Sequence, residues 1–242
     1  MGSFLNVCIY RLPQGLSIAA PRSFCPACQT PIRAYDNIPI ISFLILGGKC
    51  RKCRAPISWR YPLVEALTGA LALALFLKMG LTLSFASHFC FVAALVVITF
   101  IDLDHRLIPD VISLPGIVIG FLLALLGITI GIWNSLIGIA VGGGSLYLVA
   151  IAYEAVTKRE GMGGGDVKLL AMIGAWLGWQ AVLFTLFFSS LFGTLIGGTA
   201  MLIQKQGRHY AIPFGPFLAL GAMAFIFFGS QIIDWYLSLR KF

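Results

Sequence analysis

Charged residues are scarce in this chain of 242 residues. Asp, Glu, Lys and Arg together make up 11% of it, and only nine residues are acidic. A soluble globular domain carries about 25% charged residues. With 59% apolar residues and a mean hydropathy of +0.95, the composition excludes an ordinary soluble domain and predicts a polytopic membrane protein.

Two further absences narrow the fold and function classes to which this protein can belong. No glycine-rich stretch is followed by Lys-Ser or Lys-Thr, which excludes a phosphate-binding loop of the P-loop type. The apolar stretches do not alternate with polar residues and are too long for strands, which excludes a transmembrane barrel. The sequence therefore predicts an all-α membrane protein.

Six apolar runs are long enough to cross a bilayer as helices, which takes about 20 residues. They cover residues 62–79, 84–101, 111–131, 134–156, 180–204 and 212–238. A seventh run, 167–178, is shorter and predicts either a short span or a helix packed inside the bundle. Counting it gives about seven membrane helices. Residues 1–10 are apolar but too short to span, and we interpret them as the remnant of an N-terminal membrane helix.

The basic residues predict an orientation. Eight of the 17 lie between Arg11 and Arg60, and loops rich in Lys and Arg stay in the cytoplasm. With seven spans, all but three basic residues (Lys78, Arg240 and Lys241) fall on the cytoplasmic side. Nucleic-acid binding is the alternative interpretation of the basic segment. Membrane topology is favoured because the same bias recurs in the other polar loops.

Residues 11–61 form a polar segment with four of the six cysteines. Cys25-x2-Cys28 and Cys50-x2-Cys53 are spaced as two zinc knuckles, which place four thiolates around one ion. Two disulfides are the alternative, but a reducing cytoplasm disfavours them. A short insert buries little core, so a structural metal would stabilise it. We predict a small cytoplasmic insert with structural zinc, and expect neighbouring basic residues to lower the thiol pKa values.

Two aspartates stand at the edges of apolar runs. Asp102 ends the run 84–101, and Asp166 follows three glycines before the run 167–178. An ionisable group at a membrane boundary costs free energy and therefore indicates a function. Two carboxylates brought together can share a proton and activate water, as in aspartic proteases. We predict that Asp102 and Asp166 are catalytic, with the acid and base roles belonging to the pair.

Three residues near these aspartates have supporting roles. Gly163 and Gly165 would let a peptide backbone approach Asp166 closely, although a helix cap is the simpler role for Asp166 itself. Asp110 follows Pro109 at the expected start of a helix, which predicts an N-cap.

Two other functions compete with peptidase chemistry. A proton- or cation-coupled transporter could use Asp102 and Asp166 as a relay, but it predicts deeper carboxylates and often internal repeats, and the sequence has no evident repeat. A membrane scaffold that docks partners through the zinc module would leave both aspartates unexplained.

Six motifs, in order along the chain, carry a resemblance to a known family. They are residues 2–7 with 10–13, the two cysteine pairs, residues 61–65, the Asp102 motif, Gly163-x-Gly165-Asp166, and residues 212–216. Together they resemble the bacterial type IV prepilin leader peptidases, which are bifunctional peptidases and N-methyltransferases.

The resemblance implies catalytic roles for Asp102 and Asp166 and a zinc-type site at the four cysteines. It implies a multi-pass protein of the bacterial inner membrane, in contact with lipid, with its active site toward the cytoplasm. The expected substrates are prepilins or pseudopilins, whose basic leader is cut after a glycine. S-adenosylmethionine would donate a methyl group to the new N-terminal residue. No nucleic-acid partner is expected.

Overall fold

The computed structural model of this chain describes residues 1–158, 163–204 and 213–239. Within these residues the secondary structure is helical apart from two isolated β-bridges. The chain divides into two compact units, unit 1 (Met1–Ile101) and unit 2 (Asp102–Phe242). Each is described by itself below.

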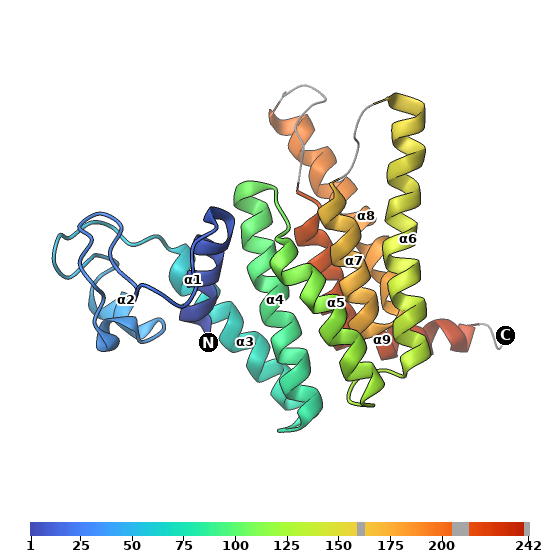
Figure 1. Ribbon diagram of the computed structural model, residues 1–242, viewed down its shortest axis with the longest axis horizontal. Helices are drawn as coiled ribbons and strands as arrows, with labels where there is room; N and C mark the ends of the chain where they lie inside the picture. The colour runs from blue at the N-terminus through green and yellow to red at the C-terminus, as the bar shows by residue number, and fades with distance from the viewer. Residues whose placement is uncertain (159–162, 205–212, 240–242) are drawn as a thin grey trace. The chain divides into compact units, whose positions relative to one another are not determined.

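Unit 1 joins the polar segment to the first long helices (Figure 1). Its elements are α1 (Gly2–Arg11), η1 (Leu12–Gln14), η2 (Ala34–Asn37), α2 (Ile41–Ile45), α3 (Arg60–Met79) and most of α4 (Leu83–His105). Helix α1 packs directly on α3, because a Cβ added at Gly2 would lie 2.7 Å from Glu65 Cα. Only glycine permits so close an approach of two backbones.

Unit 2 is a bundle built around one short helix (Figure 1). It starts in the last turn of α4 and continues with α5 (Asp110–Leu125), α6 (Ile132–Thr157), α7 (Gly164–Leu177), α8 (Trp179–Gln204) and α9 (Gly215–Leu239). Helix α7 packs against α5, α6, α8 and α9, and every residue from Leu169 to Leu177 is buried. The run 167–178 is therefore a helix packed among the other helices of unit 2.

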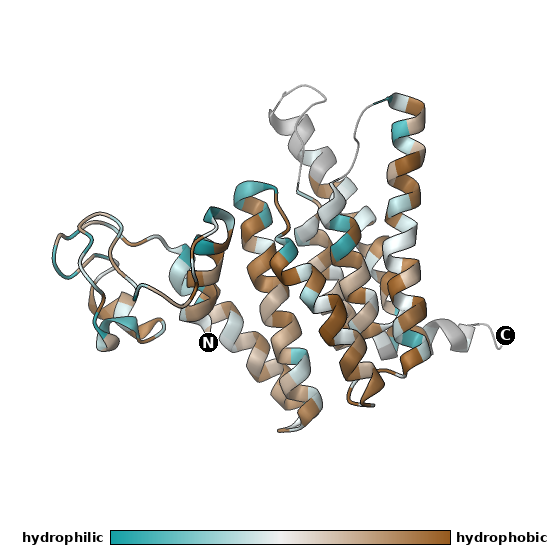
Figure 2. Cartoon of the chain, in the orientation of Figure 1, coloured by the Kyte–Doolittle hydropathy of each residue, from teal (hydrophilic) through white to brown (hydrophobic). Residues whose placement is uncertain are grey.

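Each predicted apolar run corresponds to a helix. By length and hydropathy, four helical segments could cross a membrane: Arg60–Met79, Leu83–His105, Ile132–Thr157 and Trp179–Ile196. The apolar segments Asp110–Leu125 and Gly215–Gly229 are shorter. Apolar residues predominate along the long helices (Figure 2). Among the residues that the structure describes there are thus four candidate spans with shorter apolar helices, where the sequence predicted about seven.

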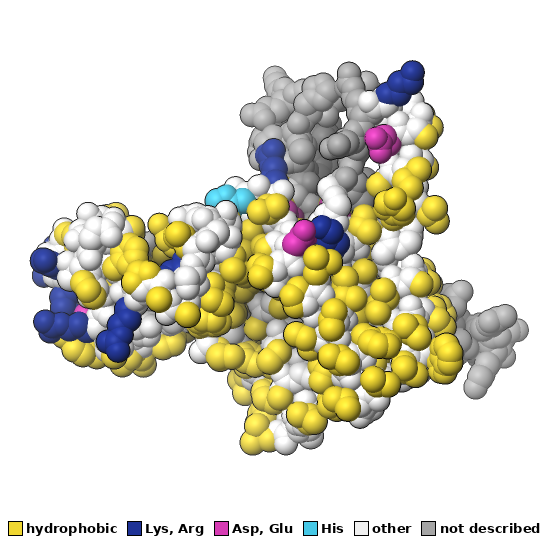
Figure 3. All heavy atoms as spheres, in the orientation of Figure 1, with side chains coloured by type: hydrophobic (Ala, Val, Ile, Leu, Met, Phe, Trp, Pro, Cys, Tyr) yellow, Lys and Arg dark blue, Asp and Glu magenta, His cyan; other side chains and the backbone are white. Residues whose placement is uncertain are grey.

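The surface of unit 2 suits a lipid environment. Figure 3 shows apolar side chains over much of its visible face, with charged side chains gathered toward one end of the helices. Large side chains such as Val118, Leu148 and Phe187 are more than half exposed, which is costly in water and favourable in hydrocarbon. Five basic residues used in the orientation argument lie outside the described residues: Arg159, Lys205, Arg208, Arg240 and Lys241.

Helices α6 and α7 meet through small residues. A Cβ at Gly138 would lie 2.2 Å from Gly174 O, and one at Gly174 would lie 2.1 Å from Gly138 O. Ser135 Oγ also donates a hydrogen bond to Ala175 O at 2.9 Å. Small residues that allow backbones to touch are the usual basis of helix association in membranes. This contact holds the buried helix α7 in place.

Replacing Gly138 with alanine should therefore destabilise the bundle. The new Cβ would overlap a backbone carbonyl, and overpacking of this kind costs about 1–3 kcal/mol. The matched control is Gly144→Ala on the same helix, where a Cβ meets nothing within 4 Å. We expect the thermal unfolding midpoint in detergent to fall for Gly138→Ala and not for Gly144→Ala. Equal midpoints for the two variants would contradict the packing described.

Candidate functional site

Asp102 lies in the last turn of α4 and is only 5% exposed. The helix ends just beyond it, because Arg106 adopts a left-handed conformation (φ 53°) while its N–H donates to Asp102 O at 2.8 Å. The Asp102 side chain accepts a hydrogen bond at Oδ2 from the Gly215 N–H, at 3.0 Å. The carboxylate is thus held by a backbone amide from far along the chain.

Gly215 is the first residue of α9, where backbone N–H groups have no partner inside the helix. A helix start also favours a negative charge. A Cβ at position 215 would lie 2.6 Å from Asp102 Oδ2, so only glycine brings this amide to the carboxylate without a shift. Residues 212–216 were noted in the sequence only for a family resemblance, and Gly215 was missed as a site residue. Ile212 lies outside the described residues.

Asp166 lies in the first turn of α7, outside the four candidate spans. The residue that caps the start of α7 is Gly163, so Asp166 is not the helix cap. The Asp166 N–H donates a hydrogen bond to Gly163 O at 3.2 Å. Burial, and secondarily the charge of Asp102, raise the pKa of the Asp166 carboxyl to about 7. The structure therefore brings these two predicted residues close enough to interact electrostatically.

Ile108 links the starts of two helices to the loop after α4. A Cβ at Gly165 would lie 2.9 Å from Ile108 Cβ, and one at Gly215 would lie 3.2 Å from Ile108 Cδ1. The side chain is 6% exposed, so it is wedged between the two glycines. Nothing in the local sequence marks this isoleucine, and it was missed.

The three glycines before Asp166 differ in what surrounds them. Gly165 is constrained by Ile108, whereas a Cβ at Gly164 would meet nothing within 4 Å. A Cβ at Gly163 would meet only the Gly165 nitrogen, at 4.0 Å. Packing therefore gives a reason for glycine at position 165 alone. Gly161 and Met162, the start of the motif, lie outside the described residues.

Asp110 is not an N-cap, so that prediction was wrong. The cap is Pro109, whose extended backbone (φ −67°, ψ 123°) leaves Asp110 as the first helical residue with no side-chain capping bond. Both Asp110 oxygens instead accept hydrogen bonds from Lys168 Nζ at 2.7 Å. This ion pair ties the start of α5 to α7 beside Asp166. Lys168 was not predicted as a site residue.

The four predicted cysteines converge in unit 1. All four Sγ atoms lie within 4.8 Å of one another, and those of Cys25 and Cys53 are 3.8 Å apart. Tetrahedral zinc with Zn–S bonds near 2.3 Å separates its sulfurs by about 3.8 Å. All six cysteines are free thiols, so the disulfide alternative is not realised. The cluster fits a metal ion.

The two cysteine pairs fold as the same turn. In the first, the Cys25 N–H donates to Thr30 O at 3.0 Å, and Gln29, with φ 57°, donates its N–H to Cys25 O at 2.8 Å. In the second, Cys50 bonds Ala55 O at 2.8 Å, and Arg54, with φ 61°, bonds Cys50 O at 3.0 Å. An isolated β-bridge closes each turn. This repetition presents both thiol pairs in the same manner.

The thiol pKa values in this cluster shift in opposite directions, and that of Cys53 is raised to about 11 by burial and by hydrogen bonds with neighbouring thiols, against a lowering hydrogen bond at Ala55. Hydrogen bonding with Thr30 lowers the pKa of Cys28 to about 6, and the backbone amides of Cys53 and Lys52 lower the pKa of Cys50. The expected cause, nearby basic side chains, was wrong. Metal ligation requires deprotonated thiols, so the hydrogen bonds of the two turns favour a metal ion at Cys28 and Cys50.

Comparison with known proteins covers nearly the whole chain. Residues 1–79 match the bacterial peptidase A24 N-terminal domain, and residues 89–198 match the type IV leader peptidase family. The chain is similar to the prepilin leader peptidase/N-methyltransferase of Aeromonas hydrophila (40% identity, covering 98% of this chain and 90% of that protein). It is similar to those of Pseudomonas aeruginosa (37%, covering 100% and 91%) and Neisseria gonorrhoeae (37%, covering 98% and 91%). No solved structure matches it significantly. The chain belongs to the type IV leader peptidase family.

Proposed function

We propose that this protein is a membrane aspartic endopeptidase that cuts the leader from type IV prepilins or pseudopilins after a glycine. The observation that carries the proposal is the pair Asp102 and Asp166, two interacting carboxylates on the ends of different helices. Full-length relatives named prepilin leader peptidase/N-methyltransferase support the substrate class and a second, methylating activity.

The two aspartates are proposed to divide the acid and base roles. A backbone N–H bonded to Asp102 Oδ2 suits the ionised form, which can accept a proton from water. Asp166, with its pKa near neutrality, is available as the protonated partner. Asp102 would take a proton from water as the oxygen attacks the scissile carbonyl, and Asp166 would protonate the carbonyl oxygen. Collapse of the tetrahedral diol then breaks the carbon–nitrogen bond: the amine receives the proton held by Asp102, and one hydroxyl of the diol returns its proton to Asp166 as the new carbonyl forms.

Glycine at the start of α7 would give the substrate room. Because no side chain stands at positions 163 to 165, an extended peptide backbone can approach Asp166 closely. The apolar stem of a pilin would lie in lipid against the apolar face of unit 2 (Figure 3). The Asp110–Lys168 pair would keep the rim of the site in place.

The proposal also covers where the site lies in the membrane. Residues 62–242 would form the helical membrane domain, with about seven helices in a bacterial inner membrane and the site toward the cytoplasm. Support comes from basic residues at the ends of the helices: Arg106 just after α4, Lys158 just after α6 and Lys168 near the start of α7. Residues 11–61 would form a cytoplasmic insert that holds structural zinc at Cys25, Cys28, Cys50 and Cys53. S-adenosylmethionine would be the methyl donor, and no nucleic acid would bind.

Loss of either catalytic carboxylate should abolish cleavage. Asp102→Asn and Asp166→Asn remove proton transfer but keep side-chain size, so we expect kcat to fall by about 10²–10⁴-fold. Mass spectrometry of a prepilin incubated with each purified variant measures the rate. Asp104→Asn, an exposed carboxylate two residues from Asp102, is the control and should cleave at nearly the wild-type rate. Wild-type rates in both catalytic variants would refute the peptidase proposal.

The glycine motif offers a sharper test of geometry. Gly165→Ala would push against Ile108 and shift the start of α7, so cleavage should slow by about 10- to 100-fold. Gly164→Ala places the same methyl group in open space and should leave the rate unchanged. Both rates come from the prepilin assay, with thermal midpoints as the check on folding. Equal rates for the two variants would mean that Ile108 does not position Asp166.

The metal proposal predicts one zinc ion per chain. Elemental analysis of the purified protein should find zinc in equal amount to protein, and Cys50→Ser should lose it because three thiolates remain. Cys90→Ser, which removes an exposed cysteine outside the cluster, should keep it. Zinc retained in full by Cys50→Ser would place the ion elsewhere.

A further inference from the structure

The segment with the four clustered cysteines, residues 11–61, exposes a group of large apolar side chains. We call this group the apolar patch, and its members are Ile41 (54% exposed), Leu44 (67%), Ile45 (74%) and Trp59 (75%). Grouped apolar side chains on a surface mark an interaction site. We propose that the apolar patch, together with basic side chains beside it, attaches this segment to the surface of a membrane that contains anionic lipid.

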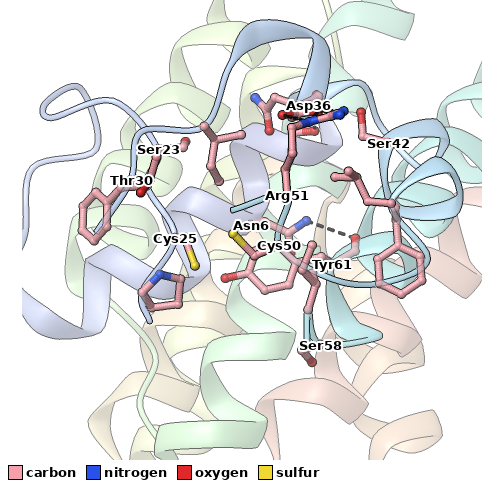
Figure 4. A pocket seen from close by; sticks show the side chains of 18 of the residues that line it. Asn6, Ser23, Cys25, Thr30, Asp36, Ser42, Cys50, Arg51, Ser58 and Tyr61 are labelled. Atoms are coloured by element: carbon pink, nitrogen blue, oxygen red, sulfur yellow. Dashed lines mark hydrogen bonds and ion pairs between the residues drawn. The ribbon is translucent and has the colours of Figure 1, made fainter. Parts of the chain in front are cut away.

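Three members of the apolar patch lie on the outer side of α2. Ile41, Leu44 and Ile45 are spaced as i, i+3 and i+4, which places them on one side of a helix. The other side is anchored within the segment, because the buried Ser42 hydroxyl donates a hydrogen bond to Tyr35 O at 2.9 Å. Figure 4 shows Ser42 on the wall of a cavity that the segment encloses with α1 and the start of α3. The outer side of α2 is thus apolar only.

Trp59 connects α2 to the start of a long helix. Its ring packs on that of Phe43 in α2, with ring centroids 4.8 Å apart. The next residue, Arg60, begins α3, which is long and apolar enough to cross a membrane. The apolar patch is therefore fixed beside the point where α3 begins.

The start of α3 lies at a membrane boundary. The Arg60 guanidinium lies over the Phe100 ring, 5.6 Å from the ring centroid, and Phe100 is near the end of the candidate span in α4. A helix start and a helix end that touch lie at the same face of the membrane. Tryptophan is enriched at this level, where its ring meets hydrocarbon and its N–H meets water. The contact thus places Trp59 and α2 at the depth of the lipid headgroups.

The charge of residues 11–61 is almost entirely positive. Eight of these residues are basic and only Asp36 is acidic, and Arg51 neutralises Asp36 through an ion pair at 2.6 Å. The turn after α2 has three exposed basic side chains that form no ion pair with any residue that the structure describes: Lys49, Lys52 and Arg54. The cytoplasmic leaflet of a membrane is negatively charged and attracts basic residues near its surface.

An apolar side bordered by basic side chains is the pattern of helices that lie in the plane of a membrane surface. Helix α2 alone is short, but Trp59 and the start of α3 fix its depth, so the patch needs little further ordering to enter the headgroup layer. Both proposed catalytic aspartates lie in unit 2, so this attachment holds or fails independently of the peptidase chemistry.

Photochemical crosslinking of the full chain in lipid nanodiscs tests the attachment. In one variant p-benzoylphenylalanine replaces Leu44, and in the matched control it replaces Leu16, which is another exposed leucine of the segment. Ultraviolet light should join phospholipid to position 44 with about ten times the yield at position 16, because only position 44 lies in the headgroup layer. Mass spectrometry of the digested chain measures both yields.

Leu16 is a suitable control because it lies beyond the start of α3. Helix α1 begins beside Glu65, one turn inside α3, and Asn6 then donates a hydrogen bond to Tyr61 O at the start of α3 (Figure 4). It therefore runs outward, and the Leu16 N–H donates to Arg11 O at its far end. Equal lipid yields at the two positions would overturn the proposal. Crosslinks from position 44 to a second copy of the chain instead of lipid would overturn it as well.

Hydrogen exchange tests the role of charge without any substitution. In the wild-type chain, backbone amides of residues 41–46 should exchange about fivefold more slowly in nanodiscs with phosphatidylglycerol than in nanodiscs of phosphatidylcholine alone, because anionic lipid strengthens attachment by about that factor for each basic residue. Residues 25–30, in the first cysteine turn, are the internal control and should exchange equally in both. The same exchange of residues 41–46 in both lipids would overturn attachment through anionic lipid.

Discussion

The close approach of three backbone segments around Asp102 is the constraint on which the proposed peptidase site depends. The end of α4, the start of α7 and the start of α9 meet at Ile108, and they can do so because Gly165 and Gly215 have no side chains. This contact lets a helix amide reach the carboxylate and brings Asp166 within electrostatic range. A methyl group at position 165 or 215 would separate groups that must act together.

Burial of α7 makes that arrangement rigid. Its residues from Leu169 onward are surrounded by four other helices, and the contact of Gly138 with Gly174 locks it to α6. A carboxylate at the end of such a helix has little freedom to move away from a neighbouring charge. Packing elsewhere in the bundle thus offsets the cost of this placement, and burial, with the charge of Asp102 second, raises the pKa of Asp166 to about 7.

Unit 1 depends on a different source of stability from unit 2. A polar insert of this length has too little apolar core to hold a cavity open by packing alone. Two matching turns bring four thiols together near one wall of a cavity within residues 3–65. Cys25 and Cys50 are among the residues that line this cavity. A metal ion at the thiols would fix that wall, while α1 and α3 supply the other through Gly2 and Glu65.

The sequence by itself determined the helical segments, because apolar runs of near-bilayer length have few other structures available. It also determined the four-cysteine cluster through local spacing, and it identified Asp102 and Asp166 as charges at apolar edges. The tertiary structure alone decided that Ile108, Gly215 and Lys168 belong beside them, and that Asp110 forms an ion pair instead of a cap. These contacts join positions far apart in the chain, and their energies depend on packing between helices, which leaves no periodic trace in the sequence.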